Sequence, residues 1–360
     1  MKKAKAGIIA ALVAVVLIGH AVVYAQYGDD RYPFVRGGKV GFIDHEGREV
    51  IPPRFSNAGD MAHFNDGLAP VFEAGFGSGY IDTSGKFVIG PTQEWGWGRP
   101  FHEDLAAVLK WGKNNSPAWI DRTGKIIFTA SSGEGNYFSD GLMPMSKDGK
   151  WGYVNKDFQF VIPPQYDLAG TFSEGRAAVT LNRKSGFIDV YGAVVVPLKY
   201  DSVWPFKDGL GRVQISIPQG TVRTFEGEEM QYAEKYGFVD HDGNEVINLQ
   251  FKFATYFSAG YALAAPSNSR LYGVIDKRGN FVHPPEFENA SEFSDGLAMA
   301  CMKQKCGYID RSGKWVIKPV FAHAESFRYG LARVSWGEGE YGYINKTGKT
   351  VWKHSTNTNQ

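Results

Sequence analysis

The chain has 360 residues, of which 43% are hydrophobic and 14% aromatic, so it is long enough to bury a large core. Its 39 basic and 38 acidic side chains nearly cancel, and this balance argues against a nucleic-acid partner, which would need a basic surface. Glycine accounts for 44 residues spread along the whole sequence, which predicts many turns.

Residues 1–25 have the pattern of a secretory signal peptide. Three lysines within the first five residues precede an apolar run from Gly7 to Gly19. Small side chains at Val23 and Ala25 then precede a cleavage point at Gln26. We therefore expect a secreted or periplasmic protein with no stable membrane insertion after cleavage. An N-terminal membrane anchor that is never cleaved is the alternative.

From residue 26 to residue 353 the sequence repeats one phrase, which defines a single repeat domain. Its anchor is a Gly-aromatic pair that occurs, with small variations, at nine places: Gly41-Phe42, Gly79-Tyr80, Ala118-Trp119, Gly152-Tyr153, Gly186-Phe187, Gly237-Phe238, Gly273-Val274, Gly307-Tyr308 and Gly342-Tyr343. The spacings are 34 to 39 residues, except for one of 51 residues. A nearly constant period of this size is typical of repeat architectures. A second phrase, such as YFSDGL at 137–142, follows about 20 residues after the anchors.

Each unit is predicted to be a three-stranded β-meander. In the last unit the strands would be residues 331–334, 341–345 and 350–352, which are rich in residue types that favour strands. Asp310 and Gly313 predict a turn in which the aspartate accepts backbone hydrogen bonds and the glycine is left-handed. Pro-Pro pairs at 52, 163 and 284 are expected to end the third strand, because proline cannot donate a ladder bond.

A regularly placed aromatic residue follows the third strand and is expected to pack between neighbouring units: Phe55, Tyr166, Tyr200, Phe251, Phe287 and Phe321. A three-stranded unit cannot bury both of its faces alone, so the units must stack. The predicted fold is therefore all-β, a tandem array of about nine meander units of 34–39 residues. The first unit has its own first strand, and the repeat pattern ends with the third strand of the last unit, so we expect an open, curved solenoid or superhelix. A closed propeller-like ring is the alternative, and residues 354–360 are expected to be a disordered tail.

Two segments depart from the repeat. Residues 90–117 keep the length of a unit but lose most of its pattern, and residues 214–235 contain an insertion of about 16 residues. Insertions in repeat arrays form loops on one face, which is often the binding face. Four tryptophans gather around the first segment, namely Trp95, Trp97, Trp111 and Trp119. They either pack in the core or form a stacking platform for a sugar or a peptide.

The sequence contains no catalytic motif and no set of residues with metal-ligand spacing, so we expect no catalytic residues, no metal site and no cofactor. An acid recurs at the turns, at Asp44, Asp82, Asp121, Asp189, Asp240, Asp276 and Asp310. Asn155 and Asn345 fill the same position, and asparagine can open a turn but cannot act as a general base. The adjacent residues 102–104, a His, a Glu and an Asp, are expected to lie in a solvated turn.

Cys301 and Cys306 are the only cysteines, and they flank the predicted turn MKQK between two strands. Two thiols that face each other across a hairpin can oxidise outside the cytoplasm, so we predict a disulfide. The alternative is a pair of buried thiols.

The phrase KWGYVNKDFQFVIPPQYDLAGTFSEGRAAV at 150–179 and its relatives resemble the WG-containing repeat, also called KWG, of bacterial envelope and secreted proteins. Only Trp151-Gly152 keeps, in register with the repeat, the dipeptide that gives the repeat its name. The tryptophan position holds other residues elsewhere, namely Val40, Ser185, Tyr236, Tyr272, Cys306 and Tyr341. The resemblance implies an all-β repeat protein that binds other molecules, and it implies no catalytic residues.

These observations favour a non-catalytic secreted or periplasmic repeat module, monomeric, that binds a protein or a glycan through its irregular segments. A carbohydrate-active enzyme on a propeller-like scaffold is the second hypothesis, and it would need two carboxylates about 5–10 Å apart in a cleft. A structural envelope component is the third. An acidic pair outside the repeated turns, brought together in a pocket, would favour the enzyme over the binding module.

Overall fold

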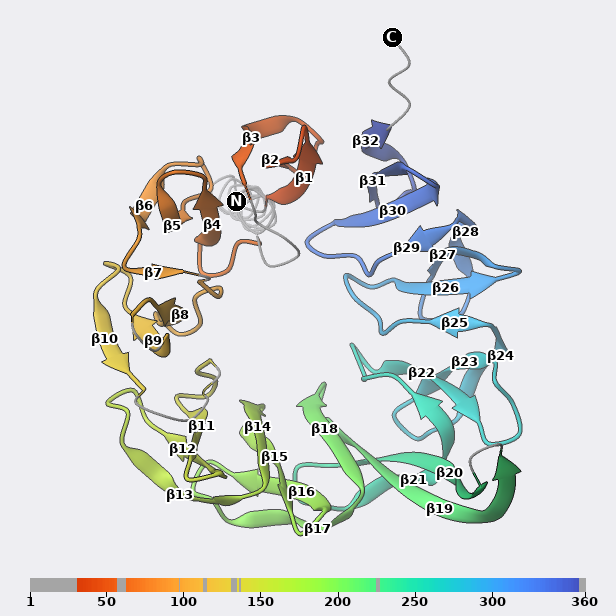
Figure 1. The fold of residues 1–360 in the computed structure, drawn as a ribbon. Helices are drawn as coiled ribbons and strands as arrows, with labels where there is room; N and C mark the ends of the chain where they lie inside the picture. Colours follow the sequence, from red (N-terminus) through yellow and green to blue (C-terminus); the bar gives the residue numbers. More distant parts are fainter. Residues whose placement is uncertain are drawn as a thin grey trace, which may run out of the picture.

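The computed structural model describes residues 31–56, 63–96, 98–112, 115–130, 135, 137–224 and 227–355. These residues form 32 β-strands arranged around a ring (Figure 1). They contain no α-helix, and therefore none that is long and apolar enough to span a membrane. The predicted signal peptide, with its cleavage point at Gln26, and residues 356–360 lie outside the described residues.

The strands group into nine units, each built around one of the nine Gly-aromatic anchors. Four units have three antiparallel strands: unit 1 with β1 (Tyr32–Arg36), β2 (Lys39–Ile43) and β3 (Glu49–Phe55), unit 2 with β4 (Ala69–Glu73), β5 (Gly77–Ile81) and β6 (Phe87–Thr92), unit 4 with β11 (Met143–Lys147), β12 (Lys150–Val154) and β13 (Phe160–Tyr166), and unit 7 with β22 (Tyr261–Pro266), β23 (Tyr272–Asp276) and β24 (Phe281–Phe287). The predicted tandem array of antiparallel meanders is confirmed.

The other five units have a fourth strand, formed by the segment that was expected only to connect one unit to the next. Unit 3 has β7 (Trp95–Gly96), β8 (Ala106–Lys110), β9 (Ser116–Ile120) and β10 (Ile126–Thr129), and unit 5 has β14 (Leu168–Ser173), β15 (Arg176–Leu181), β16 (Lys184–Asp189) and β17 (Val194–Tyr200). Unit 6 has β18 (Ser202–Lys207), β19 (Leu210–Thr224), β20 (Gly227–Val239) and β21 (Glu245–Ala254). Unit 8 has β25 (Asn289–Ala290), β26 (Ala298–Met302), β27 (Lys305–Ile309) and β28 (Trp315–Phe321), and unit 9 has β29 (His323–Ala324), β30 (Leu331–Gly337), β31 (Glu340–Asn345) and β32 (Thr350–Ser355). Units 6 and 7 share one sheet, because β21 continues until it pairs with β22.

The third strand runs through its Pro-Pro pair, so the expectation that the sheet stops there was wrong. β13 includes Pro163 and Pro164, and after a bulge its pairing resumes with Tyr166 opposite Trp151. The strand lies at the edge of its sheet, where a missing N–H group removes no ladder bond.

The bulge explains the glycine of the Gly-aromatic anchor. A Cβ atom at Gly152 would lie 2.4 Å from the carbonyl oxygen of Ile162 and 2.7 Å from the nitrogen of Pro164, because the bulged strand folds over the glycine. Unit 3 is the informative exception. Its anchor has Ala118, its third strand has only four residues, and Thr129 pairs directly with Ala118.

Neighbouring units are joined by a pair of aromatic rings. The ring after the glycine in one unit packs against a phenylalanine of the second phrase in the next, with centroids 4.8 Å apart for Tyr153 and Phe172. Both rings are buried, and the hydroxyl of Tyr153 donates to the carbonyl oxygen of Gly170 at 2.8 Å. The same ring pair recurs at five other boundaries: Phe42–Phe64, Tyr80–Phe101, Phe187–Phe206, Phe238–Phe257 and Tyr308–Phe327.

The aromatic residue at the end of the third strand also packs between units, as predicted. Phe55 of unit 1 lies edge-on to Phe87 of unit 2, with centroids 6.1 Å apart. Phe321 of unit 8 makes the same kind of contact with Trp336 of unit 9, at 5.7 Å. The boundaries between units 1 and 2 and between units 8 and 9 therefore each contain two aromatic contacts, one at the Gly-aromatic anchor and one at the end of the third strand.

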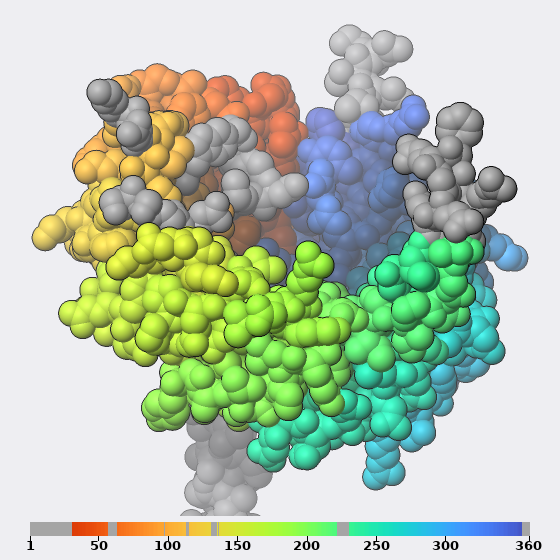
Figure 2. Space-filling model, turned by 60° about the horizontal axis from the view of Figure 1, so that its bottom comes forward, coloured from red at the N-terminus to blue at the C-terminus, as the bar shows by residue number. Residues whose placement is uncertain are grey.

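The first and last units pack together, so the array is a closed ring and the expected open solenoid was wrong. Figure 2 shows the red N-terminal unit against the blue C-terminal unit. Tyr343 packs on Tyr32 with centroids 5.6 Å apart, and its hydroxyl donates to the carbonyl oxygen of Pro33 at 2.9 Å. Phe34 and Trp352 extend this seam, at 5.1 Å. The ring after the anchor glycine of the last unit thus also closes the ring of units, here against Tyr32 of β1 and not against a second-phrase phenylalanine, and no shared sheet is needed.

The insertion is a β-hairpin and not the expected loop. β19 and β20 pair from Gly211 opposite Val239 out to Thr224 opposite Gly227, and the hairpin projects beyond the ring at the lower right of Figure 1. Residues with high strand propensity, such as Ile215 and Ile217, make this extension favourable.

The predicted disulfide is confirmed. Cys301 and Cys306 lie directly opposite each other on β26 and β27 and are bonded, with their Cα atoms 4.0 Å apart.

Replacing Gly152 by Ala should lower the free energy of unfolding by about 2–3 kcal/mol, because the added methyl group meets the bulged backbone of β13. Urea denaturation measures the change. The reverse replacement in unit 3, Ala118→Gly, is the matched control and should cost only about 1 kcal/mol. Equal costs for the two variants would show that the bulge does not require the glycine.

Candidate binding site

The four tryptophans noted in the sequence do not form one surface platform. Trp95 and Trp119 are each only 1% exposed and belong to two different core clusters, so both pack in the core. Trp111 is 42% exposed and covers Gly96, where a Cβ atom would lie 2.2 Å from the indole. Trp97 lies outside the described residues.

The recurring turn acids have a structural role, as predicted. Asp310 accepts hydrogen bonds through Oδ1 from the backbone N–H groups of Ser312 and Lys314, at 2.8 and 3.1 Å, and Gly313 has a φ of +81°. The side-chain oxygen makes the same two contacts at the other eight positions: Asp44, Asp82, Asp121, Asn155, Asp189, Asp240, Asp276 and Asn345.

The polar group at residues 102–104 is a turn, as expected. Glu103 and Asp104 have φ values of +51° and +70°. Glu103 accepts a hydrogen bond from the N–H group of Gly141 at 3.1 Å and pairs with Lys156 at 3.3 Å, and both partners belong to the next unit. Asp104 lies 3.6 Å from Arg122.

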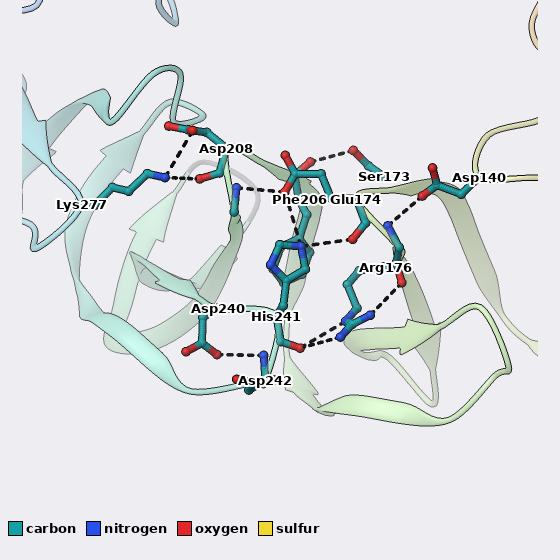
Figure 3. Close-up of polar contacts among 12 residues, drawn as sticks. Asp140, Ser173, Glu174, Arg176, Phe206, Asp208, Asp240, His241, Asp242 and Lys277 are labelled. Atoms are coloured by element: carbon teal, nitrogen blue, oxygen red, sulfur yellow. Dashed lines mark hydrogen bonds and ion pairs between the residues drawn. The ribbon is translucent and has the colours of Figure 1, made fainter.

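Acids of the second phrase, such as Glu103, bind groups of the following unit, and we call this set of contacts a latch. Figure 3 shows the latches of units 5 to 7. Glu174 of unit 5 accepts from the N–H group of Gly209 at 2.9 Å, and its Oε2 lies 3.4 Å from Nε2 of His241, both in unit 6. Asp208 of unit 6 pairs in the same way with Lys277 of unit 7, at 3.3 Å. The acids of the second phrase thus hold the ring together, a role that was not predicted from the sequence.

A pocket of about 400 Å³ lies among units 6 to 9. Its wall consists mainly of aromatic and hydroxyl side chains and holds two charged groups, Arg212 and Glu292. The aromatic residues form part of a row that begins at the base of the inserted hairpin. Successive ring centroids lie 5.5, 6.2 and 6.3 Å apart along Trp204, Tyr236, Phe253 and Tyr272.

Arg212 lies close to several aromatic rings in this pocket. Its guanidinium carbon is 4.2 Å from the ring centroid of Trp204 and 4.7 Å from that of Tyr256, distances at which cation–π attraction is effective. Nη1 donates to the carbonyl oxygen of Ala254, whereas the buried Nε has no acceptor among the described residues. Burial lowers the pKa of the guanidinium, which nevertheless stays charged at neutral pH.

Within the described part of the chain, no carboxylate forms an ion pair with Arg212. The acid in the same pocket, Glu292, pairs with Lys207 at 2.9 Å. Lys207 also lies over the ring of Tyr256, 5.5 Å from its centroid. Glu292 acts on Arg212 at longer range, as an attraction that raises the pKa of the guanidinium without an ion pair, so the pocket keeps one positive charge that no described carboxylate contacts directly.

A second pocket, of about 540 Å³, lies between units 5 and 6, and Trp204 lines it as well. It brings together Asp167 and Asp201, an acidic pair outside the repeated turns. Lys150 hydrogen-bonds to Asp167 and lowers its pKa. Burial raises the pKa of Asp201, but the hydrogen bond and charge of Lys184 together with the N–H group of Ser216 outweigh burial, and the pKa is lowered.

Both acids of this second pocket also fasten the backbone of their own units. Asp167 accepts from the N–H group of Asn182 and Asp201 from that of Ser216, each at 2.7 Å. In the described ranges no three His, Cys, Asp or Glu side chains gather as metal ligands would.

Trp204 and Arg212 were not singled out from the sequence, although one signal pointed to them. Trp204 lies two residues before the phenylalanine of its second phrase, where units 5 and 7 have Gly170 and Thr255. No other unit has an aromatic residue at this position, so the tryptophan marks a departure from the repeat inside an otherwise regular phrase.

Comparisons with known proteins identify a family and a fold. A family model described as "WG containing repeat" matches residues 41–75, 79–113, 119–151, 151–184, 186–216, 236–264, 272–306 and 307–335. A sequence comparison with curated proteins gives no match. A solved structure described as "Crystal structure of the eukaryotic initiation factor" has a TM-score of 0.62 at 12% identity, over 91% of this chain and 95% of that chain. At this identity the likeness shows the fold alone.

A second solved structure, "Dihydro-heme d1 dehydrogenase NirN in complex with DHE", has a TM-score of 0.45 at 13% identity, over 90% of this chain and 72% of that chain. BamB from Moraxella catarrhalis has a TM-score of 0.39 at 9% identity, over 78% and 94%. Likenesses this low carry no argument about function.

The turn acids predict how stability depends on pH. The hydroxyls of Ser84 and Thr123 donate to Asp82 and Asp121 and lower the pKa of each carboxyl. A lowered folded-state pKa stabilises the protein above the ordinary pKa of aspartate, and this stability is lost as the pH falls through the folded value. Asparagine opens the same turn in units 4 and 9. Replacing both Asp82 and Asp121 by Asn should therefore reduce the loss of stability in acid.

Urea denaturation between pH 7 and about pH 2.5 measures this dependence for wild type and for the double variant. An unchanged pH dependence in the double variant would contradict the proposed origin of the acid sensitivity.

Proposed function

This chain belongs to the family of WG-containing repeat proteins, and from that membership we propose that it is a non-catalytic module that binds a protein or a glycan. The observation that carries the proposal is the aromatic pocket around Arg212 in units 6 to 9. Ligand sites are typically concave and mostly apolar, with a few polar groups that fix the orientation of the ligand. The pocket combines four aromatic rings with an arginine, a glutamate and several hydroxyl groups, so it is more polar than such sites usually are.

The pocket also lies where the repeat is least regular. β21 of unit 6 runs on into unit 7, the inserted hairpin begins beside Tyr236, and Trp204 is an aromatic residue at a place where the other units have none. Regular positions are explained by the needs of the ring. The departures are not, and this favours a role for them in recognition.

The acidic groups favour binding over hydrolysis. Asp167 and Asp201 share a pocket, but a glycosidase needs one carboxylic acid with a raised pKa, and both of these are lowered by lysine partners. The turn acids are committed to backbone hydrogen bonds, and Glu103, Glu174 and Asp208 to the latches.

We further propose that the protein acts outside the cytoplasm. The apolar leader at residues 1–25 supports export, and a disulfide such as Cys301–Cys306 persists in oxidising compartments.

The proposal is tested by screening the mature protein on a glycan array and against separated envelope proteins. Phe253 is 38% exposed in the pocket, so Phe253→Ala should weaken binding at least about tenfold while stability changes little. Trp111→Ala is the matched control, because Trp111 is a similarly exposed ring in unit 3, outside the pocket.

Capture that is lost in Phe253→Ala and kept in Trp111→Ala supports the pocket. Capture that is kept in Phe253→Ala and lost in Trp111→Ala would instead indicate that unit 3 binds the ligand. Mass spectrometry of the captured glycan shows whether it is cleaved, and cleavage would contradict the non-catalytic role.

A further inference from the structure

Units 6 and 9 carry the same arginine in different surroundings. Arg212 and Arg333 occupy equivalent places in the phrases DGLGRV and YGLARV. Both lie near the tyrosine that directly precedes the anchor glycine of their unit. The guanidinium carbon of Arg212 is 5.8 Å from the ring centroid of Tyr236, and that of Arg333 is 4.8 Å from the ring centroid of Tyr341. The two units therefore provide an internal comparison within one chain.

The two arginines differ in their partners. In unit 9, Nη1 of Arg333 lies 3.7 Å from Oε1 of Glu325. Glu325 lies two residues before the phenylalanine of its second phrase, and the equivalent residue in unit 6 is Trp204. The indole therefore stands where unit 9 has a carboxylate.

This exchange leaves Arg212 with aromatic faces and, among the described residues, without a carboxylate partner. A partly buried charge without a counter-charge is unfavourable, and a hydrogen-bonded ionic partner relieves it. In unit 9 the chain supplies that partner. In unit 6 the space in front of the guanidinium is the pocket.

We propose that this pocket binds an acidic glycan, and that a carboxylate on one of its sugar rings pairs with Arg212 as Glu325 pairs with Arg333. The inference rests on the proposed binding function and names the class of ligand. Aromatic rings such as Phe253 and Tyr272 offer apolar faces for the C–H face of a sugar. The hydroxyl of Ser326, on unit 9, donates to Ser291 at 3.1 Å and can still accept a hydrogen bond from a sugar hydroxyl.

Glu292 does not cancel the positive charge of the pocket. Its carboxylate lies 2.9 Å from the ammonium group of Lys207, so these two charges compensate each other. Replacing Glu292 by Gln should make the pocket more positive and strengthen the binding of an acidic ligand.

The test measures the affinity of the full mature protein by calorimetry for three acidic probes, each compared with its neutral methyl ester. The probes are a galacturonate tetrasaccharide, a hyaluronan tetrasaccharide and sialyllactose. Wild type should bind at least one acid about tenfold more tightly than its ester, which is the usual effect of a charged hydrogen bond. Glu292→Gln should raise that preference.

Two variants should abolish the preference. Arg212→Met removes the charge, and Trp204→Glu keeps Arg212 but supplies it with the internal partner that unit 9 has. Arg333→Met is the matched control and should leave the preference intact. Thermal melting of each variant separates loss of binding from loss of folding.

Three outcomes would overturn the inference: acids and esters bound equally by wild type, no acidic probe bound at all, or a preference that Arg333→Met removes as fully as Arg212→Met. A tetraglutamate peptide bound as tightly as the sugars would overturn the glycan class. Binding of neutral glycans that Phe253→Ala abolishes and Arg212→Met leaves unchanged would support the proposed binding function and overturn the inference of an acidic ligand.

Discussion

One aromatic contact organises the molecule. The ring that follows the anchor glycine in one unit packs against a ring of the next, as Tyr153 does with Phe172, and both are buried. The glycine is needed because the bulged third strand crosses it at a distance that leaves no room for a Cβ atom. Repetition of this contact turns nine small units, none of which could bury its own faces, into one ring.

The candidate site follows from the places where this rule is relaxed. The regular boundaries are fixed by ring pairs, turn acids and latches, and they leave few side chains free for other roles. Around unit 6 the chain departs from the repeat by an inserted hairpin, by a strand that runs on into unit 7, and by Trp204, an aromatic residue at a place where the other units have none. These departures coincide with the pocket and with an arginine that lies close to two aromatic rings.

Local features were predictable from the sequence, and features that depend on distant contacts were not. The turn at Asp310 and Gly313 and the disulfide between Cys301 and Cys306 each depend on a few consecutive residues. Ring closure depends on how the curvature of nine units accumulates, which no single phrase encodes. The pocket joins Arg212 to Ser326, residues more than a hundred positions apart, so only the fold could bring them together. The burial of Trp95 and Trp119 likewise depends on neighbouring strands.

Ring closure is the central claim, and electron paramagnetic resonance tests it most directly. Spin labels at Val35→Cys in unit 1 and Thr350→Cys in unit 9 lie on exposed positions at the two sides of the seam. Cys301 and Cys306 are bonded to each other and do not take up the label. A closed ring predicts a single narrow distance, much shorter than that between labels at Val35→Cys and Arg183→Cys in unit 5. A broad distribution that reaches or exceeds the distance to unit 5 would contradict the closed ring.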